Sequence, residues 1–200
     1  DWVARLALDA WAHGQTVAPE HAAPFYLRDK VAFTTAEREA GEGGNPRART
    51  HAGVAVLRMT AADLPEVVEL ERQVQSFPWT PRNFADALEA GYEAWCLRAG
   101  DRLIGFCVAM MAPDVAHVLV IAVARDVQRR GHGVLLLEQV AVCARTRSIE
   151  AILLEVRRSN EGARAFYAAQ GFETIGTRRD YYPFGQGQRE DALVLKKSTI

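Results

Sequence analysis

Hydrophobic and polar residues follow a regular pattern along residues 54–200, and that pattern predicts a sheet flanked by helices. Short runs rich in β-branched and aromatic residues, bounded by glycine, proline or polar residues, predict strands. Longer stretches with apolar residues three or four positions apart predict helices. The expected order is strand, two helices, three strands, helix, strand, helix and two strands. The predicted strands are 54–59, 95–98, 103–111, 117–123, 151–156, 172–178 and 191–196.

Capping residues and prolines predict where the helices begin and end. Thr60 is expected to cap a first helix, which Pro78 cannot continue because proline has no backbone N–H. Thr80 is expected to cap the second helix, and Asn160 to cap the last one. Between the last two strands the sequence predicts an aromatic loop over residues 179–184.

Residues 1–53 differ in character from the rest of the chain. Residues 2–11 have apolar positions at helical spacing, which predicts a short helix. Residues 39–53 hold four glycines, one proline and no large apolar residue, which is typical of a flexible linker. The chain starts at Asp1 without an initiator methionine or a signal peptide, so we expect it to be a piece of a longer protein.

The composition narrows the class of protein. A formal net charge of -1 and a pI of about 6.6 give no overall attraction to nucleic acid or to anionic membranes. The three cysteines are odd in number and lack C-x-x-C spacing, which argues against disulfides and zinc. We expect core thiols in a reducing, cytoplasmic compartment and no metal site. No apolar run approaches the roughly 18 residues of a membrane span.

The strongest local signal is a glycine loop between a buried strand and a helix. The apolar run 117–123 is followed by the loop 128–133, with the sequence Gln-Arg-Arg-Gly-His-Gly, and then by a helical pattern. Gly131 and Gly133 lack a Cβ, so the backbone can turn tightly and aim several N–H groups at one point. A helix N-terminus favours an anion, and Arg129 adds positive charge there, as does its neighbour Arg130. The loop therefore predicts a diphosphate cradle.

Two better-known phosphate motifs do not fit this loop. A dinucleotide fingerprint needs a third glycine, but Leu136 occupies that position. A P-loop needs Gly-Lys-Ser/Thr, which is absent here. His132, between the two glycines, is expected to be a solvated loop residue, and His117 a surface residue of its strand.

Two residues suggest acid–base chemistry. Glu155 is a carboxylate within an otherwise apolar strand, and Tyr167 follows on the next helix. In one interpretation Glu155 removes a proton from an ammonium group through an ordered water, and Tyr167 protonates a departing thiolate. In the other, Glu155 is a surface carboxylate at a sheet edge and Tyr167 is a core aromatic residue. The pattern alone favours the second interpretation.

The chain resembles a known enzyme family over residues 59–196. The six-residue loop matches Q/R-x-x-G-x-G/A, the coenzyme A pyrophosphate loop of the GNAT N-acetyltransferases. The likeness is to the RimI-type ribosomal-protein-alanine N-acetyltransferases of that superfamily. It is carried by Phe77-Pro78-Trp79, Ile121-Ala122-Val123, Gln128 to Gly133, Leu154 to Arg157, Ser159-Asn160, Phe166-Tyr167, Gly171-Phe172, Arg179 to Pro183 and Arg189 to Ala192.

The resemblance implies an α/β (α+β) GNAT fold over residues 54–200, with a mixed central sheet flanked by helices. It implies direct acetyl transfer from acetyl-CoA, in a ternary complex, to the N-terminal alanine of a small-subunit ribosomal protein. Glu155 would be the proton acceptor and Tyr167 the proton donor. Coenzyme-binding residues would be Ile121, Ala122, Val123, Arg129, Arg130, Gly131, His132, Gly133, Val134 and Asn160. Residues flanking the peptide would be Phe77, Pro78, Trp79, Tyr181 and Tyr182.

Some positions leave room for other roles. Val134 stands where a basic or polar residue often follows the second glycine, which removes one possible phosphate contact. Trp79 is as compatible with the core as with a substrate wall. Asn160 can cap its helix and also contact the coenzyme.

Residues 1–38 resemble the C-terminal tail of TsaB, a partner in threonylcarbamoyladenosine modification of tRNA. This resemblance implies a fusion, and possible partners among the other proteins of that modification. Two alternatives to the ribosomal-protein activity stay open. The first is a broader acetyltransferase for lysine side chains or small amines, and the second is an inactive coenzyme-binding module tethered to the modification partner.

Overall fold

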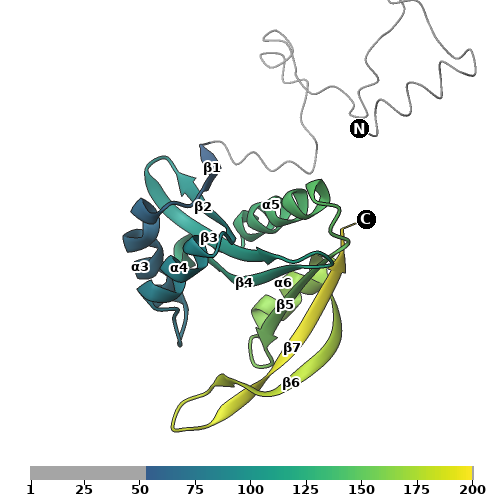
Figure 1. The fold of residues 1–200 in the computed structure, drawn as a ribbon. Helices are drawn as coiled ribbons and strands as arrows, with labels where there is room; N and C mark the ends of the chain where they lie inside the picture. The colour runs from purple at the N-terminus through teal and green to yellow at the C-terminus, as the bar shows by residue number, and fades with distance from the viewer. Residues whose placement is uncertain (1–52, 200) are drawn as a thin grey trace, which may run out of the picture. The chain divides into compact units, whose positions relative to one another are not determined.

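The computed structural model describes residues 53–199 (Figure 1). The chain divides into two units, residues 1–48 and 49–200, and the described residues belong to the second. The predicted helix at 2–11, the TsaB-like segment 1–38 and the linker up to residue 52 lie outside the described residues.

Seven strands form one mixed sheet in the order β1-β2-β3-β4-β5-β7-β6. All neighbouring strands are antiparallel except β4 and β5, which are parallel. A parallel pair needs a crossover connection, and the helix between these two strands provides it. The strands are β1 Val54–Arg58, β2 Glu93–Ala99, β3 Arg102–Met111, β4 Ala116–Val123, β5 Ala151–Arg157, β6 Glu173–Pro183 and β7 Arg189–Ser198.

Helices cover both faces of the sheet, so the core has two parts. On one face α3 and α4 bury Val67 and Phe84 against Phe106 of β3. On the other face α5 buries Leu136 and Val140 against β4 and β5, and α6 packs beside it. The helices are α3 Leu64–Val74, α4 Pro81–Glu89, α5 His132–Thr146 and α6 Glu161–Ala169, with short 3-10 helices η2 Ala61–Asp63 and η3 Arg125–Val127.

The predicted order of elements is confirmed, and two local predictions are corrected. Thr60 begins the 3-10 turn η2, which leads into α3 at Leu64. The predicted aromatic loop 179–184 is wrong, because β6 continues to Pro183 and the turn follows it. The register of β6 against β7 shifts between Arg178 and Tyr182, and β6 pairs with β7 before and after this shift.

The parallel strands β4 and β5 pair over only a short distance. Three pairs join them, ending at Val118 opposite Leu154, whereas β4 continues to Val123 and β5 to Arg157. Beyond this point β4 pairs only with β3, and β5 only with β7. The centre of the sheet therefore opens at the carboxyl ends of these two strands, where α/β sheets commonly bind ligands.

Arg98 of β2 fixes η2 and α3 to the sheet. Its guanidinium lies 2.8 Å from Asp63 Oδ1 and 2.9 Å from Glu66 Oε1, and it donates to the carbonyl oxygen of Asp101 at 2.7 Å. The side chains of Arg98 and Asp63 are 16% and 18% exposed, so water weakens this ion pair only in part. Burial raises the pKa of Asp63, but the hydrogen bonds from Arg98 and Thr60 outweigh it and lower the pKa below 3.8.

We expect Arg98→Gln to lower the free energy of unfolding by about 1 kcal/mol at pH 7. Because the folded pKa of Asp63 is lowered, its contribution is present above the unfolded pKa and is lost as the pH falls through the folded value. The difference between wild type and variant should therefore shrink below about pH 4. Urea unfolding between neutral and acidic pH measures it. Arg102→Gln, which removes the exposed pair with Asp126, is the matched control and should change little.

Candidate active site

Glu155 lies on β5 just beyond the point where β4 and β5 separate. Its side chain is 6% exposed, and β5 lies between β4 and β7, so the interpretation as a surface carboxylate at a sheet edge is wrong. Glu155 Oε2 is 2.6 Å from His117 Nε2. Oε1 is 3.1 Å from Arg178 Nε, an ion-pair distance without hydrogen-bond geometry.

These neighbours keep Glu155 ionised. Burial raises its pKa, but the hydrogen bond from His117 and the positive charge of Arg178 outweigh that effect and lower the pKa below 4.5. A buried negative charge is thus held at the opening between the two strands.

The sequence prediction for His117 is wrong. It was expected on the strand surface, but it is paired with the buried carboxylate. Parallel pairing sets His117 opposite Leu153, and Glu155 is two residues further along β5 on the same face of the sheet. Only the strand register brings the two side chains together, and the sequence does not reveal that register.

Arg157 joins two segments that were predicted to flank a peptide. Its guanidinium lies 4.4 Å from the ring centroid of Tyr182 and 5.1 Å from that of Phe77. It also pairs with Glu190 at 2.7 Å. The loop after α3 and the β6–β7 hairpin therefore meet close to Glu155, whose carbonyl oxygen accepts a hydrogen bond from Tyr182 Oη at 3.2 Å.

The predicted peptide-flanking residues have different exposures. Phe77 is 44% and Tyr181 40% exposed, and Pro78 is also exposed. Tyr181 packs edge-on against Tyr182. Trp79 is only partly exposed and packs against the part of the core beneath α3 and α4, with its ring 5.2 Å from that of Phe84, so most of it belongs to the core.

Glu71 of α3, which the sequence did not single out, holds this loop. It is 1% exposed, and its Oε1 accepts a hydrogen bond from the backbone N–H of Trp79 at 3.2 Å. Its Oε2 has no hydrogen-bond partner among the described residues, and burial raises its pKa. The buried carboxyl is thus retained for one backbone contact.

Glu71→Gln should raise the free energy of unfolding by about 1 kcal/mol at pH 7, since the amide oxygen can replace the carboxylate without a buried charge. A raised folded pKa means that stability is lost as the pH rises through it, so the wild type should weaken as the pH rises past the ordinary range of a glutamate and the variant should not. Thermal unfolding across this range measures the difference. Glu71→Leu, which leaves the Trp79 N–H unpaired, should instead destabilise the protein.

The glycine loop has the backbone of an anion site. Arg129 and Gly131 have positive φ angles of 61° and 89°, and Gly131 is the N-cap of α5. Within residues 53–199, the backbone N–H groups of Arg129, Arg130, Gly131 and Gly133 have no protein acceptor. The Val134 N–H donates to the carbonyl oxygen of Gly131 at 3.0 Å, so it is not one of these free donors.

Two side chains hold the glycine loop in place through contacts with backbone carbonyl oxygens. His132 is only 7% exposed, and its Nδ1 lies 3.0 Å from the carbonyl oxygen of Val127, so the prediction of a solvated residue is wrong. Gln128 Nε2 donates to the carbonyl oxygen of Val123 at 2.9 Å. Gly133 has a further role, because a Cβ there would come within 3.0 Å of the Phe166 ring on α6.

The other predicted coenzyme residues lie on both sides of the opening. Residues 121–123 of β4 pair with β3 alone, so the edge of β4 that faces β5 is free along this stretch. Asn160 caps α6, its Oδ1 accepting from the N–H of Ala163 at 3.0 Å. Such a free strand edge offers main-chain hydrogen bonds to an extended ligand.

Tyr167 lies on α6 with its ring in the part of the core beneath α5 and α6, between Phe166 and Phe172. It is 7% exposed, and burial raises the pKa of its phenol above the ordinary value of 10. Among residues 53–199 its hydroxyl has no hydrogen-bond partner. It is therefore a core aromatic residue that also keeps a protonated hydroxyl available.

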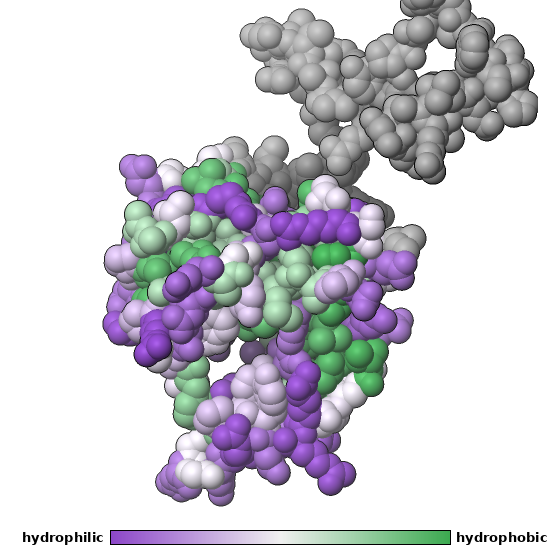
Figure 2. Space-filling model, in the orientation of Figure 1, coloured by the Kyte–Doolittle hydropathy of each residue, from purple (hydrophilic) through white to green (hydrophobic). Residues whose placement is uncertain are grey.

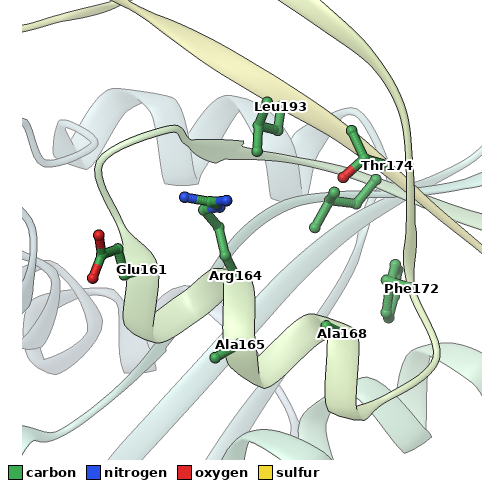
Figure 3. A pocket seen from close by; sticks show the side chains of 8 residues that line it. Glu161, Arg164, Ala165, Ala168, Phe172, Thr174 and Leu193 are labelled. Atoms are coloured by element: carbon green, nitrogen blue, oxygen red, sulfur yellow. The ribbon is translucent and has the colours of Figure 1, made fainter.

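Two pockets lie within residues 53–199, and neither is lined by Glu155, Tyr167 or the glycine loop. One is a groove of about 450 Å³ between α6 and strands β6 and β7, lined by Arg164, Phe172 and Leu193 among others (Figure 3). The other lies beside α3 and α4. Figure 2 shows that the surface is also hollowed where the body of the sheet meets the mostly hydrophilic β6–β7 hairpin.

Within residues 53–199 there is no cluster of three or more histidine, cysteine, aspartate or glutamate residues that could hold a metal ion. No helix in this part of the chain is long and apolar enough to cross a membrane.

Comparison with known proteins identifies the family and the fold. Residues 62–172 match the profile of the acetyltransferase (GNAT) family. The chain belongs to the GNAT acetyltransferase family. A [ribosomal protein bS18]-alanine N-acetyltransferase of Salmonella typhimurium is 37% identical over 137 residues, which are 68% of this chain and 92% of that protein. Its Escherichia coli counterpart is 34% identical over 140 residues, which are 70% of this chain and 94% of that protein.

A solved structure supports the same conclusion. The crystal structure of the ribosomal-protein-S18-alanine N-acetyltransferase from Escherichia coli superposes with a TM-score of 0.68 and 32% identity, covering 73% of this chain and 94% of that one. The acetyltransferase thus has the GNAT fold and uses acetyl-CoA as acetyl donor. Its free loop amides at a helix N-terminus suit the pyrophosphate of that substrate.

Proposed function

We propose that this acetyltransferase transfers acetyl from acetyl-CoA to the N-terminal α-amine of a protein, and that its substrate is the N-terminal alanine of a small-subunit ribosomal protein. The observation that carries the proposal is the buried Glu155 carboxylate at the opening between β4 and β5. The relatives in Salmonella typhimurium and Escherichia coli, named as bS18-alanine N-acetyltransferases, support the choice of substrate.

The two sides of the opening have separate tasks. The amides of the 129–133 loop hold the pyrophosphate, residues 121–123 hold the pantetheine arm, and Asn160 contacts another part of the coenzyme. The bound thioester supplies the electrophilic acetyl group. On the other side, Glu155 attracts the ammonium and promotes loss of its proton, while Tyr167 donates a proton to the departing thiolate.

Aromatic residues form the proposed peptide-binding site. The Arg157 guanidinium lies between the rings of Phe77 and Tyr182, and Phe77 and Tyr181 expose their rings. Pro78 and Trp79 complete the proposed peptide site. A short alanine side chain would leave room for the amine to approach Glu155. Cys96 and Cys107 are unsuited as acyl carriers, since both are buried and burial raises the pKa of both thiols.

We further propose the cytoplasm as the location, and the division of the chain into a TsaB-like segment 1–38, a linker 39–53 and the catalytic domain 54–200. The TsaB-like segment supports a link to proteins of threonylcarbamoyladenosine modification. Deletion of residues 1–53 should leave peptide acetylation intact.

A peptide panel tests the proposed function. Peptides starting with alanine, serine or methionine, and an N-blocked peptide with an internal lysine, are incubated with acetyl-CoA, and mass spectrometry locates the acetyl group. We expect the alanine peptide to be acetylated on its α-amine and the blocked peptide to remain unmodified. Equal reaction of the blocked lysine peptide would establish the broader acetyltransferase instead. Coenzyme binding without any acetylation would establish the inactive module.

Gly131→Ala should weaken coenzyme A binding about tenfold. An alanine at φ 89° is strained by roughly 1–2 kcal/mol, and relief of this strain would turn the loop amides away from the pyrophosphate. Isothermal titration with coenzyme A measures the affinity. Gly171→Ala is the matched control, because Gly171 has a φ of 82° and open space around it at the end of α6. It should lose similar stability and bind coenzyme A normally.

A further inference from the structure

The His117–Glu155 pair has an asymmetry that the proposed function does not use. The imidazole is the more accessible partner, since the side chain of His117 is 18% exposed and that of Glu155 only 6%. His117 Nε2 lies 2.6 Å from Glu155 Oε2. The other ring nitrogen, Nδ1, has no hydrogen-bond partner within residues 53–199. The carboxylate is therefore behind the imidazole and fixes its orientation.

The charges around the pair favour His117 over Glu155 as the proton acceptor. Glu155 faces Arg178 of β6, and Tyr182 of the same strand bonds its carbonyl oxygen. Arg157 and Glu190 neutralise each other nearby. The neighbours lower the pKa of Glu155, so its carboxylate is a weak acceptor for the proton of an α-ammonium. Histidine is the side chain suited to proton transfer near neutral pH.

Given the proposed function, we propose that His117 takes the proton from the incoming amine and that Glu155 is the positioning residue behind it. The neutral imidazole donates its Nε2–H to Glu155 and keeps a lone pair on Nδ1. An N–H bond of the ammonium breaks as an N–H bond forms at Nδ1, directly or through one water. The amine keeps the electron pair, the imidazolium is stabilised by Glu155, and the proton then leaves to solvent.

The pH dependence of His117→Gln and Glu155→Gln tests this assignment. For the amine that the wild type acetylates, kcat/KM should fall on acidification as an imidazole gains its proton. His117→Gln should lower the plateau about 10²-fold and remove that acidic limb. Glu155→Gln should be slow but keep the limb. If His117→Gln kept both the wild-type kcat/KM and the fall of kcat/KM at acidic pH, the proposal would be overturned. Coenzyme A affinity and melting temperature show that each variant is folded.

A second measurement does not depend on activity. Nitrogen NMR of ¹⁵N-histidine-labelled protein should show the Nε2–H tautomer of His117 in the wild type and a mixture of tautomers in Glu155→Gln. A wild-type Nδ1–H tautomer would overturn the proposal. Acetylation of lysine side chains alone would contradict the proposed N-terminal substrate but not the role of His117, because the pH profile is measured with whichever amine reacts.

Discussion

Replacing Glu155 with glutamine should lower kcat/KM for an alanine-starting peptide by about 10²–10⁴-fold, without weakening coenzyme A binding. Glutamine keeps the shape of the side chain and can still accept the hydrogen bond from His117, but it has no negative charge. Neither the incoming ammonium nor an imidazolium at His117 is then stabilised. The initial rate of thiol release at saturating acetyl-CoA measures the effect.

Glu150→Gln is the matched control for this change. Glu150 is an exposed carboxylate just before β5, and its replacement removes the same charge outside the opening between β4 and β5. It should acetylate peptides at the wild-type rate. If Glu155→Gln also retained that rate, Glu155 would have no part in proton removal.

Tyr167→Phe should lower kcat/KM about 10²-fold and leave the melting temperature nearly unchanged. The ring keeps its contacts with Phe166 and Phe172, and the lost hydroxyl has no partner among residues 53–199. In the proposed mechanism, the substitution removes only the proton donor for the departing thiolate. Thiol release and thermal unfolding, measured on the same preparation, separate the two effects.

The pH profile adds a second check on Tyr167. Because burial raises the pKa of its phenol above 10, the hydroxyl stays protonated across the working range, so it should cause no loss of rate up to about pH 10. A basic limb near pH 9 that disappears in Tyr167→Phe would contradict this. Tyr92→Phe, a change outside the site, should leave rate and profile unaltered.

The parts of the fold that depend on local pattern could be predicted from the sequence. Alternating or continuous apolar runs predicted the strands, and capping residues such as Thr80 and Asn160 predicted where helices begin. The glycine loop was also predictable, because Gly131 has the positive φ that only glycine adopts easily. The family resemblance then gave the fold, which the comparisons confirm.

The parts that depend on tertiary register could not be predicted. The pairing of His117 with Glu155 follows from three residue pairs between β4 and β5, which no local pattern encodes. His132 turns inward because a backbone carbonyl is available beneath the loop. The sequence predicts a loop at the aromatic residues of β6, because proline usually interrupts strands and Pro183 lies among them. In the structure a register shift keeps this segment paired with β7.

The most direct test of the account is a crystal structure of the protein with coenzyme A and an alanine-starting peptide. We expect pyrophosphate oxygens within hydrogen-bond distance of the amides of residues 129–133, and the peptide amine beside His117 and Glu155 at the opening between β4 and β5. A peptide amine on the opposite face of the sheet, or a pyrophosphate away from the Gly131 loop, would contradict it.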